Sequence, residues 1–460
     1  MAITAEFRDA LARCVDAGRI LSEAADTWVY GYDNSRKHSP PDLVVLAENA
    51  HEARAVIRLC YEHNVPIVAR GRGTATTGAA IPTRGGVVLA LERMNRILRM
   101  DPANRAMVVE AGVTNQEVQD AAAKHGFFWP PDPTSAAYCS VGGNLAVNAA
   151  GPRAVKYGST RENTLGLRAI LGNGEEIHTG TYTTKGAVGY DLTRLLIGSE
   201  GTLAVILEAT LKLTPLPETR RLMQAVYASV TDAAAAISRI MAQPATPCAL
   251  EFMDAAAIEM IRDFSQAALP QDAGALLLIE VDGPASALDG MVAAIQTAAT
   301  GNGLVEFRAA ETKSDAEAIW TTRKALSPAL RSIAPNKLNE DVVVPVSRLP
   351  ELIDGLGALS RRYGIPIVNF GHAGNGNIHV NLMYDSQNPQ QAASALPCVR
   401  AVFDLVLTLG GTLSGEHGIG CAKREYIALA IDPVTLDLMK RIKAQFDPKG
   451  ILNPDKIFPD

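Results

Sequence analysis

Three glycine-rich segments most constrain what this chain can fold into. They are RGRGTATTGAA from Arg70, SVGGNLAVNAAG from Ser140 and IGSEGTLAV from Ile197. Glycine lets a backbone approach a ligand closely and leaves amide groups accessible, and the first segment adds threonine hydroxyls. Because the three segments recur through the first half of the chain, they predict contacts to one long ligand.

The first segment follows a strand-like run and departs from the common nucleotide motifs. Its glycines, its threonine hydroxyls and Arg70 suit a pyrophosphate. However, Thr76 stands where GxGxxG requires glycine, and no GK[ST] follows. The segment therefore carries neither a Rossmann fingerprint nor a Walker loop, which argues against a classical NAD site. Taken alone, the segment fits a structural turn equally well.

The second segment is more specific. Ser140 can cap a helix whose first turn contains Gly142 and Gly143. Small residues follow them, so a flat ring or a phosphate can approach this backbone closely.

The residues around these segments predict alternating strands and helices. Ahead of the first segment lie two apolar runs separated by a helix pattern, which Asn49 and Glu52 begin as a capping box. Thr114 and Glu117 form a second box. Residues 173–174, Asn-Gly between apolar runs, predict a β-hairpin. The first part of the chain is thus expected to be α/β.

A domain boundary is predicted at Pro215 and Pro217, which end a long strand-like run. Beyond it, strands and helices alternate at short spacing, which is typical of an α+β domain. The predicted fold class is α+β. Its parts are a ligand-binding domain at 1–217, a substrate (cap) domain with an antiparallel sheet at 218–420, and a C-terminal helix and tail at 421–460 that pack back on the first domain.

Composition excludes several classes of partner. The 460 residues carry a net charge of −6 without a basic block, which argues against nucleic acid. Six cysteines without a CxxC pair favour a reducing compartment. The N-terminus predicts an amphipathic helix rather than a signal peptide, and no apolar stretch approaches the roughly 18 residues of a membrane span. We expect a cytoplasmic protein, with peripheral attachment at the inner face of the membrane as the alternative.

Polar residues gather in two glycine-flanked stretches near the C-terminus. In GHAGNGNIHVNL, His372 precedes a run in which strand alternation places Asn377, His379 and Asn381 on one face. In SGEHGIG, Glu416 and His417 are neighbours on a loop. Two histidines and a carboxylate suit zinc, manganese or iron, whereas a histidine pair alone would more often be structural.

Such a metal, with an open position, can chelate the hydroxyl and carboxylate of a 2-hydroxy acid together and lower the hydroxyl pKa. A base must then accept the hydroxyl proton, and His417 is our candidate. The reverse assignment, with Glu416 as base and His417 as ligand, fits the sequence as well.

Taken together, the three glycine-rich segments resemble the FAD-binding domain of the vanillyl-alcohol oxidase and p-cresol methylhydroxylase (PCMH) superfamily. In that domain two α/β subdomains hold an extended FAD, so the resemblance implies a two-subdomain, PCMH-type first domain. The implied FAD contacts are Arg70, Gly71, Arg72, Gly73, Thr74, Thr77 and Gly78, then Pro131, Asp132, Ser135, Gly142, Gly143 and Asn148, and finally Gly201 and Val205. Because the first segment contains neither histidine nor cysteine, we expect non-covalent FAD.

The stretches FGHAGNGNIHVNL, SGEHGIGCAKREY and FDPKGILNPDKIF resemble the C-terminal domain of the FAD-dependent D-2-hydroxyacid dehydrogenases. This family includes D-lactate dehydrogenase, the FAD subunit of glycolate oxidase and D-2-hydroxyglutarate dehydrogenase. The resemblance covers nearly the whole chain. It implies His372, His379 and Glu416 as ligands of a metal, zinc before manganese or iron, with His417 as base and Asn381 as a substrate contact.

The same resemblance implies that Arg323 and Lys337 lie near the substrate carboxylate. From the residues alone, Arg323 on a helix would be a solvated side chain.

By resemblance, the activity is oxidation of a small D-2-hydroxy acid, D-lactate or glycolate, with hydride transfer to FAD. Electrons would then pass to a quinone, an electron-transfer flavoprotein or a cytochrome. D-2-hydroxyglutarate or D-malate is the alternative substrate. A flavin-dependent transferase and a non-catalytic flavin- or metal-binding subunit are further hypotheses, which a flavin that no hydroxy acid reduces would favour. A homodimer is compatible with the sequence.

Overall fold

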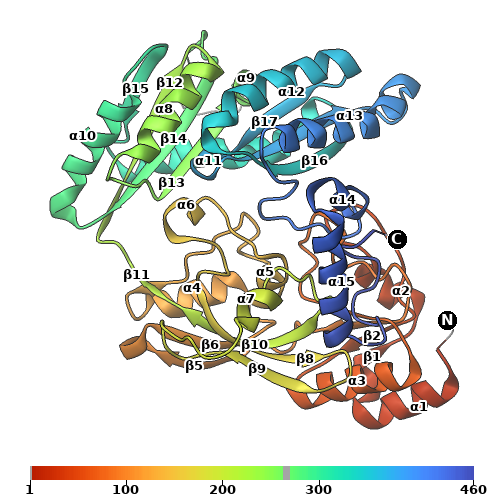
Figure 1. Ribbon diagram of the computed structural model, residues 1–460. Coiled ribbons are helices and arrows are strands. Elements are labelled where there is room, and N and C mark those ends of the chain that lie inside the picture. The colour runs from red at the N-terminus through yellow and green to blue at the C-terminus, as the bar shows by residue number, and fades with distance from the viewer. Residues whose placement is uncertain (1–2, 263–269, 460) are drawn as a thin grey trace. The chain divides into compact units, whose positions relative to one another are not determined.

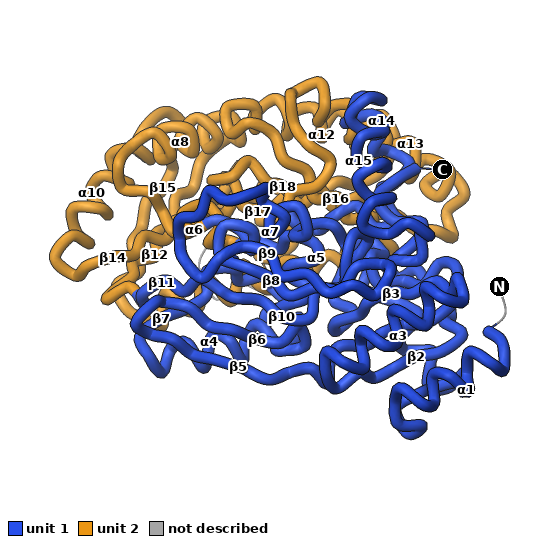
Figure 2. Tube along the Cα trace, turned by 60° about the horizontal axis from the view of Figure 1, so that its bottom comes forward, with its two compact units in different colours: residues 1–151, 158–216, 416–460 blue, residues 152–157, 217–415 orange. Residues whose placement is uncertain are grey.

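The computed structural model describes residues 3–262 and 270–459. The chain divides into two compact units, coloured separately in Figure 2. Unit 1 comprises residues 1–151, 158–216 and 416–460, and unit 2 comprises 152–157 and 217–415. The chain therefore enters unit 2 twice and returns to unit 1 between Gly415 and Glu416.

The first sheet of unit 1 has the strand order β1-β2-β4-β3. Its strands are β1 (Ile20–Leu21), β2 (Leu43–Leu46), β4 (Val87–Ala90) and β3 (Ile67–Arg70), and the last three are parallel. Helix α3 (Ala50–His63) connects β2 to β3 and packs with α1 (Ala5–Cys14) (Figure 1). The predicted strand-helix-strand unit is therefore confirmed.

The two predicted capping boxes differ in outcome. At α4 (Asn115–Ala123), Thr114 and Glu117 form both bonds of the box. At α3, the Asn49 side chain caps the helix, but Glu52 accepts from the backbone N–H of Glu48 and from Arg19 instead. The second half of that box was wrong, because Arg19, distant in sequence, competes for the carboxylate.

The second sheet of unit 1 is antiparallel, with the order β5-β6-β10-β8-β9. Its strands are β5 (Ile97–Asp101), β6 (Ala106–Glu110), β10 (Ala204–Lys212), β8 (Thr164–Leu171) and β9 (Glu176–Gly180). The hairpin predicted at 173–174 joins β8 to β9, with Gly174 at φ +84°. Among the described strands of unit 1, parallel pairing is thus confined to the first sheet.

Further helices and one strand pair belong to unit 1. These are α2 (Ala24–Thr27), the pair β7 (Phe127–Phe128) and β11 (Thr214–Pro215), α5 (Val141–Val147), α7 (Leu192–Leu196), α14 (Ile427–Ala430) and α15 (Pro433–Phe446). Helix α5 packs against β10, which places the second glycine-rich segment on the second sheet.

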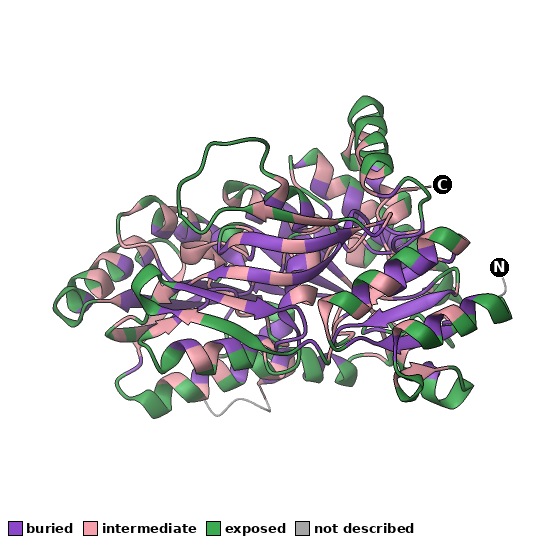
Figure 3. Cartoon of the chain, turned by 90° about the horizontal axis from the view of Figure 1, so that it is seen from below, coloured by how far each residue is buried: buried purple, intermediate pink, exposed green. Residues whose placement is uncertain are grey.

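Unit 2 is built on a seven-stranded sheet, β15-β12-β14-β13-β17-β18-β16, in which every neighbouring pair is antiparallel. The strands are β12 (Thr219–Tyr227), β13 (Ala249–Asp254), β14 (Ala275–Gly283), β15 (Leu304–Ala309), β16 (Asn336–Val343), β17 (Ile367–His372) and β18 (Asn377–Tyr384). The helices are α6 (Ala154–Tyr157), α8 (Val230–Ala242), α9 (Ala255–Ile261), α10 (Leu288–Ala299), α11 (Lys313–Ala329), α12 (Leu349–Tyr363) and α13 (Pro389–Thr408). Strands β13, β14, β17 and β18 are buried over almost their whole length, whereas β15 at the edge is not. Figure 3, coloured by burial, shows strands with long buried stretches and helices with exposed outer faces.

Helix α13 has the length and apolar composition to cross a membrane, contrary to the expectation from the sequence. Within unit 2 it packs against α12, β16 and β18. Its buried residues, among them Val402, Phe403 and Val406, recur at helical spacing. These contacts are typical of an amphipathic core helix.

Candidate functional site

In unit 1 the glycine-rich segments come together at the N-terminus of α5. A Cβ added to Gly71 would lie 2.2 Å from the Ser140 Oγ, and one on Gly142 would lie 2.7 Å from the Cβ of Ala111. Ser140 caps α5 by accepting from the backbone N–H of Gly143. The first two segments thus approach each other as closely as backbones without side chains allow.

The third segment joins the second through backbone hydrogen bonds. The N–H of Gly198 donates to the carbonyl of Leu145 at 2.9 Å, and that of Glu200 donates to the carbonyl of Ala146 at 2.7 Å. All three segments therefore line one region of unit 1, as one long ligand requires.

Buried polar atoms in this region fit an anionic cofactor. Arg70 is 7% exposed, and its Nη1 finds no hydrogen-bond partner among the described residues; neither do the Thr76 Oγ1 and the Asn144 Nδ2. Burial lowers the pKa of Arg70. Because unpaired buried donors are costly, a bound group that accepts hydrogen bonds would stabilise them. FAD, when bound, would supply such acceptors through its phosphates.

Other residues expected at FAD have structural contacts of their own. Thr77 donates its hydroxyl to the His417 carbonyl, and Gly78 lies against the Cys421 thiol. Asn148 has φ +54°, and its Oδ1 accepts from Ser159. Val205 is buried in the apolar core of unit 1. The remaining expected contacts lie on loops: Arg72, Gly73, Thr74, Pro131, Asp132, Ser135 and Gly201.

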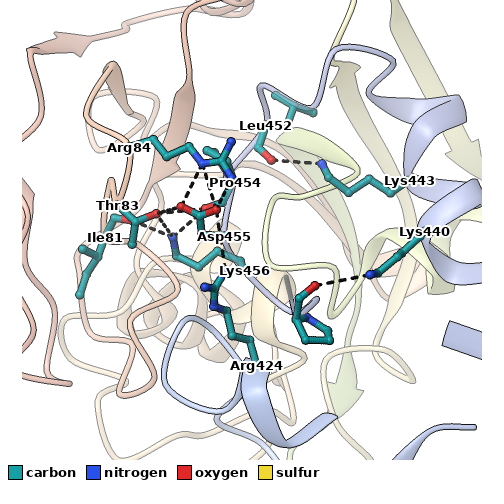
Figure 4. Close-up of polar contacts among 11 residues, drawn as sticks. Ile81, Thr83, Arg84, Arg424, Lys440, Lys443, Leu452, Pro454, Asp455 and Lys456 are labelled. Atoms are coloured by element: carbon teal, nitrogen blue, oxygen red, sulfur yellow. Dashed lines mark hydrogen bonds and ion pairs between the residues drawn. The ribbon is translucent and has the colours of Figure 1, made fainter. Parts of the chain in front are cut away.

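The C-terminal segment is hydrogen-bonded to the first glycine-rich segment and the residues after it. Figure 4 shows Lys456 among the backbone oxygens of Ile81 and Pro454, with Nζ–O distances of 2.8 and 3.1 Å, and Asp455 paired with Arg84. Lys456 is buried, which lowers its pKa. Lys456 therefore bonds backbone carbonyls of two separate segments of unit 1.

Glu200 connects the third glycine-rich segment to the loop that follows His417. Its carboxylate oxygens accept from the backbone N–H groups of Ile419 and Gly420 at 2.6 and 2.7 Å. Burial raises the pKa of Glu200 to about 7. Glu416, at the start of the same loop, accepts from the N–H of Gly151 at 2.7 Å. The backbone around His417 is therefore fixed within unit 1.

In unit 2 the predicted polar face of β18 is confirmed. Asn377 donates to the Asp341 Oδ1 at 2.6 Å, and His379 lies opposite Asp341 in the strand register. Asn381 accepts from Asn339 at 2.7 Å. The three residues of β18 thus meet polar partners on β16.

His372 ends β17 and lies beside His379, with ring centroids 5.2 Å apart. Its Nδ1 is 2.5 Å from the Glu251 Oε1, and Glu251 also accepts from Arg323, at 2.8 Å from Nε and 2.6 Å from Nη2. Burial alone would raise the pKa of Glu251, but His372 and Arg323 lower it to about 2. An imidazole pair backed by an ionised carboxylate fits the coordination of a divalent metal.

The two residues expected near a substrate carboxylate lie on different elements of unit 2. Arg323 is on α11 with its side chain 13% exposed, and its guanidinium lies over the Phe370 ring, with Cζ 5.0 Å from the ring centroid. The solvated side chain expected from the residues alone was wrong, because Glu251 and Phe370 bury it. Lys337 is on β16, opposite Met383, and is partly buried.

Sequence reasoning missed two buried carboxylates, Glu251 and Asp341. Asp341 accepts from Asn377 and from the N–H of Gly415, the residue before Glu416. Each carboxylate shares its segment with a second acid, Asp254 in ALEFMD and Glu340 in EDVVV. An acid among apolar strand residues was the available signal, since a buried charge needs a partner.

Two family models match the chain: "FAD binding domain" over residues 41–180 and "FAD linked oxidases, C-terminal domain" over 216–457. Glycolate oxidase subunit GlcD of Bacillus subtilis is 37% identical over 99% of this chain and 97% of its own. D-lactate dehydrogenase of Archaeoglobus fulgidus is 36% identical over 90% and 91%.

Solved structures agree on the fold. A p-cresol methylhydroxylase with substrate bound matches with a TM-score of 0.83 at 16% identity, covering all of this chain and 98% of that one. An alkyldihydroxyacetonephosphate synthase matches at 0.76 and 20% identity, covering 98% and 85%. The fold is that of the PCMH-type flavoproteins.

The chain belongs to the FAD-linked oxidases, and within them to the oxidoreductases related to glycolate oxidase subunit GlcD and D-lactate dehydrogenase.

Proposed function

We propose that this protein oxidises a small D-2-hydroxy acid, D-lactate or glycolate, to the 2-keto acid, using non-covalent FAD and a divalent metal. The observation that carries the proposal is the His372–His379 pair on adjacent strands, with Glu251 behind it. It occurs in a chain about a third identical, over most of its length, to a glycolate oxidase subunit and a D-lactate dehydrogenase.

The proposed metal ligands are His372, His379 and Glu416, with zinc as the first candidate. A divalent metal, when bound, would chelate the substrate hydroxyl and carboxylate oxygens and lower the hydroxyl pKa. Arg323 and Lys337 supply positive charge for the carboxylate, and Asn381 adds a polar contact.

Oxidation removes two electrons and two hydrogens from the acid. His417 accepts the hydroxyl proton as the carbonyl forms, and Glu416 is the alternative base. The hydrogen on the 2-carbon leaves with its bonding pair, which FAD, when bound, accepts. The electrons then leave to a quinone, an electron-transfer flavoprotein or a cytochrome.

The test is an anaerobic spectral titration of the purified holoenzyme. D-lactate, L-lactate, glycolate, D-malate and D-2-hydroxyglutarate are added separately while the flavin absorbance is followed. We expect bleaching by D-lactate or glycolate and none by L-lactate. Bleaching by D-malate or D-2-hydroxyglutarate alone would transfer the proposal to those acids, and a flavin that none of them reduces would contradict it.

A second arm tests the metal. His379→Ala is expected to lose bound metal while keeping FAD, because an imidazole ligand is removed and the glycine-rich segments of unit 1 are untouched. His178→Ala, an exposed histidine on β9, is the matched control. Metal content is measured by elemental analysis after desalting. Full metal content with full turnover in His379→Ala would contradict the ligand assignment.

A further inference from the structure

We propose that Glu251 is a positioning residue that fixes the ring tautomer of His372 and the orientation of the Arg323 guanidinium. The inference rests on the proposed function, because it gives one residue a role for both the metal ligand and the substrate-carboxylate group. The central part of the inference is the tautomer of His372. It is argued from contacts within unit 2, and the tautomer can be measured without any substrate.

Glu251 has no other evident reason to be an acid. It lies in the middle of β13, where all six residues are buried, and its side chain is fully buried. A carboxylate in such a strand is costly unless it is paired and hydrogen-bonded. An apolar residue would serve packing alone, so the pairing partners explain its presence.

The strand register places His372 next to the Glu251 carboxylate. Glu251 and His372 are directly opposed across the β13–β17 pair, so their side chains project from the same face. The resulting Oε1–Nδ1 distance is 2.5 Å. The contact is therefore set by backbone pairing rather than by a mobile loop.

An ionised carboxylate can accept a hydrogen bond but cannot donate one. Nδ1 of His372 must therefore carry a proton, and the neutral ring keeps its lone pair on Nε2. A carboxylate behind a histidine fixes the ring and raises its basicity toward a metal. Glu251 thus selects the nitrogen with which His372 can coordinate.

The second oxygen of Glu251 orients Arg323. Oε2 accepts from Nε and Nη2, which occupy one edge of the guanidinium. Its other edge, which includes Nη1, is not used by Glu251 and has the fork geometry that binds a carboxylate. Because both contacts share one side chain, any shift of Glu251 disturbs the metal ligand and the carboxylate-binding group together.

The decisive variant is Glu251→Gln, which keeps the shape of the side chain. If the amide oxygen continues to accept from Arg323, the amide nitrogen faces His372 and can only donate to Nδ1. The His372 proton is then displaced to Nε2, and the ring can no longer coordinate through that atom. Glu280→Gln on the adjacent strand β14 is the matched control, since Glu280 is also buried but contacts Trp320 and Cys248.

Nitrogen-15 spectra of histidine-labelled, FAD-loaded, chelator-treated protein report the tautomer directly, with His372→Gln assigning the signal. We expect the Nδ1-protonated ring in the wild type and in Glu280→Gln, and the Nε2-protonated ring in Glu251→Gln. Zinc affinity, measured by competition with a chromophoric chelator, should fall about 10- to 100-fold in Glu251→Gln alone.

A wild-type His372 protonated at Nε2, or at both nitrogens, at neutral pH would overturn the inference. So would a Glu251→Gln protein that keeps the wild-type tautomer and zinc affinity. FAD content and melting temperature show whether Glu251→Gln folds. If it does not fold, Glu251→Asp replaces it, and this variant must keep the wild-type tautomer of His372 and bind zinc more weakly. Failure of the proposed function would give a different result from failure of this inference. In that case no hydroxy acid would bleach the wild-type flavin, whichever tautomer His372 adopts.

Discussion

The glycine-rich region of unit 1 and the polar sheet face of unit 2 differ in how their polar groups are satisfied. In unit 1, the Arg70 Nη1, the Thr76 Oγ1 and the Asn144 Nδ2 have no hydrogen-bond partner among the described residues. In unit 2, Glu251 bonds His372 and Arg323. The difference teaches that the glycine-rich region leaves buried donors that a ligand would satisfy, whereas both oxygens of Glu251 already bond side chains of unit 2.

This comparison predicts separable losses of function, and the largest should come from the proposed base. His417→Ala should lower turnover by roughly 10²- to 10⁴-fold, because the group proposed to accept the hydroxyl proton is removed. FAD content should be unchanged, since Thr77 contacts the His417 backbone and not its ring. Steady-state rates and the flavin spectrum measure both quantities. A variant with wild-type turnover would remove His417 from the mechanism and favour Glu416.

The next largest effect should be a loss of FAD affinity without a loss of metal. Arg70→Met deletes a buried guanidinium and should weaken FAD binding by about 10- to 100-fold, as expected for charge-assisted hydrogen bonds. Metal content should stay at the wild-type level. Arg93→Met, whose surface guanidinium pairs with Glu48, is the control. Equal FAD affinity in Arg70→Met, measured by reconstitution of the apoprotein, would break the contrast drawn between the two regions.

A pH dependence should distinguish the loop around Glu200. The folded state holds the Glu200 proton up to about pH 7, whereas the ordinary pKa is 4.5. Its contribution to stability is therefore full below about pH 4.5 and declines as the pH rises toward 7, by on the order of 3 kcal/mol.

Glu200→Gln cannot titrate, so the free energy of unfolding should lose this decline between those pH values. Denaturant titrations across the range measure it, with the exposed Glu175→Gln as control. An unchanged slope in Glu200→Gln would mean that the carboxylate is already ionised, held by the Ile419 and Gly420 amides.

The smallest effect is expected at the cap of α5. Ser140→Ala removes the acceptor for the Gly143 N–H and should lower the free energy of unfolding by about 1 kcal/mol. Turnover with saturating FAD should be retained. Chemical denaturation checks the first statement. Stability equal to the wild type would show that the α5 terminus is satisfied in another way.

The sequence was informative where the chemistry lies in local pattern. Glycine spacing, the Ser140 cap and the alternation of Asn377, His379 and Asn381 were sufficient to predict the glycine-rich region and the polar strand face. What it could not supply was long-range pairing. Glu251 meets His372 only because β13 and β17 are neighbours, although they are separated by more than 100 residues.

Competition between partners explains the local errors. Glu52 bonds Arg19 instead of completing the capping box, and Arg323 pairs with the buried Glu251 instead of facing solvent. The antiparallel second sheet pairs β6 with β10, which lie far apart in the sequence. None of these outcomes is encoded in a short window of residues.

The central claim is that oxidation of the hydroxy acid needs the metal as well as the flavin. The most direct measurement mixes anaerobic D-lactate or glycolate with three preparations that have equal FAD content: native, chelator-treated, and chelator-treated with zinc restored. The account predicts rapid flavin bleaching in the first and third and at least a hundredfold slower bleaching in the second. Equal rates in all three, with metal shown to be absent from the second, would contradict it.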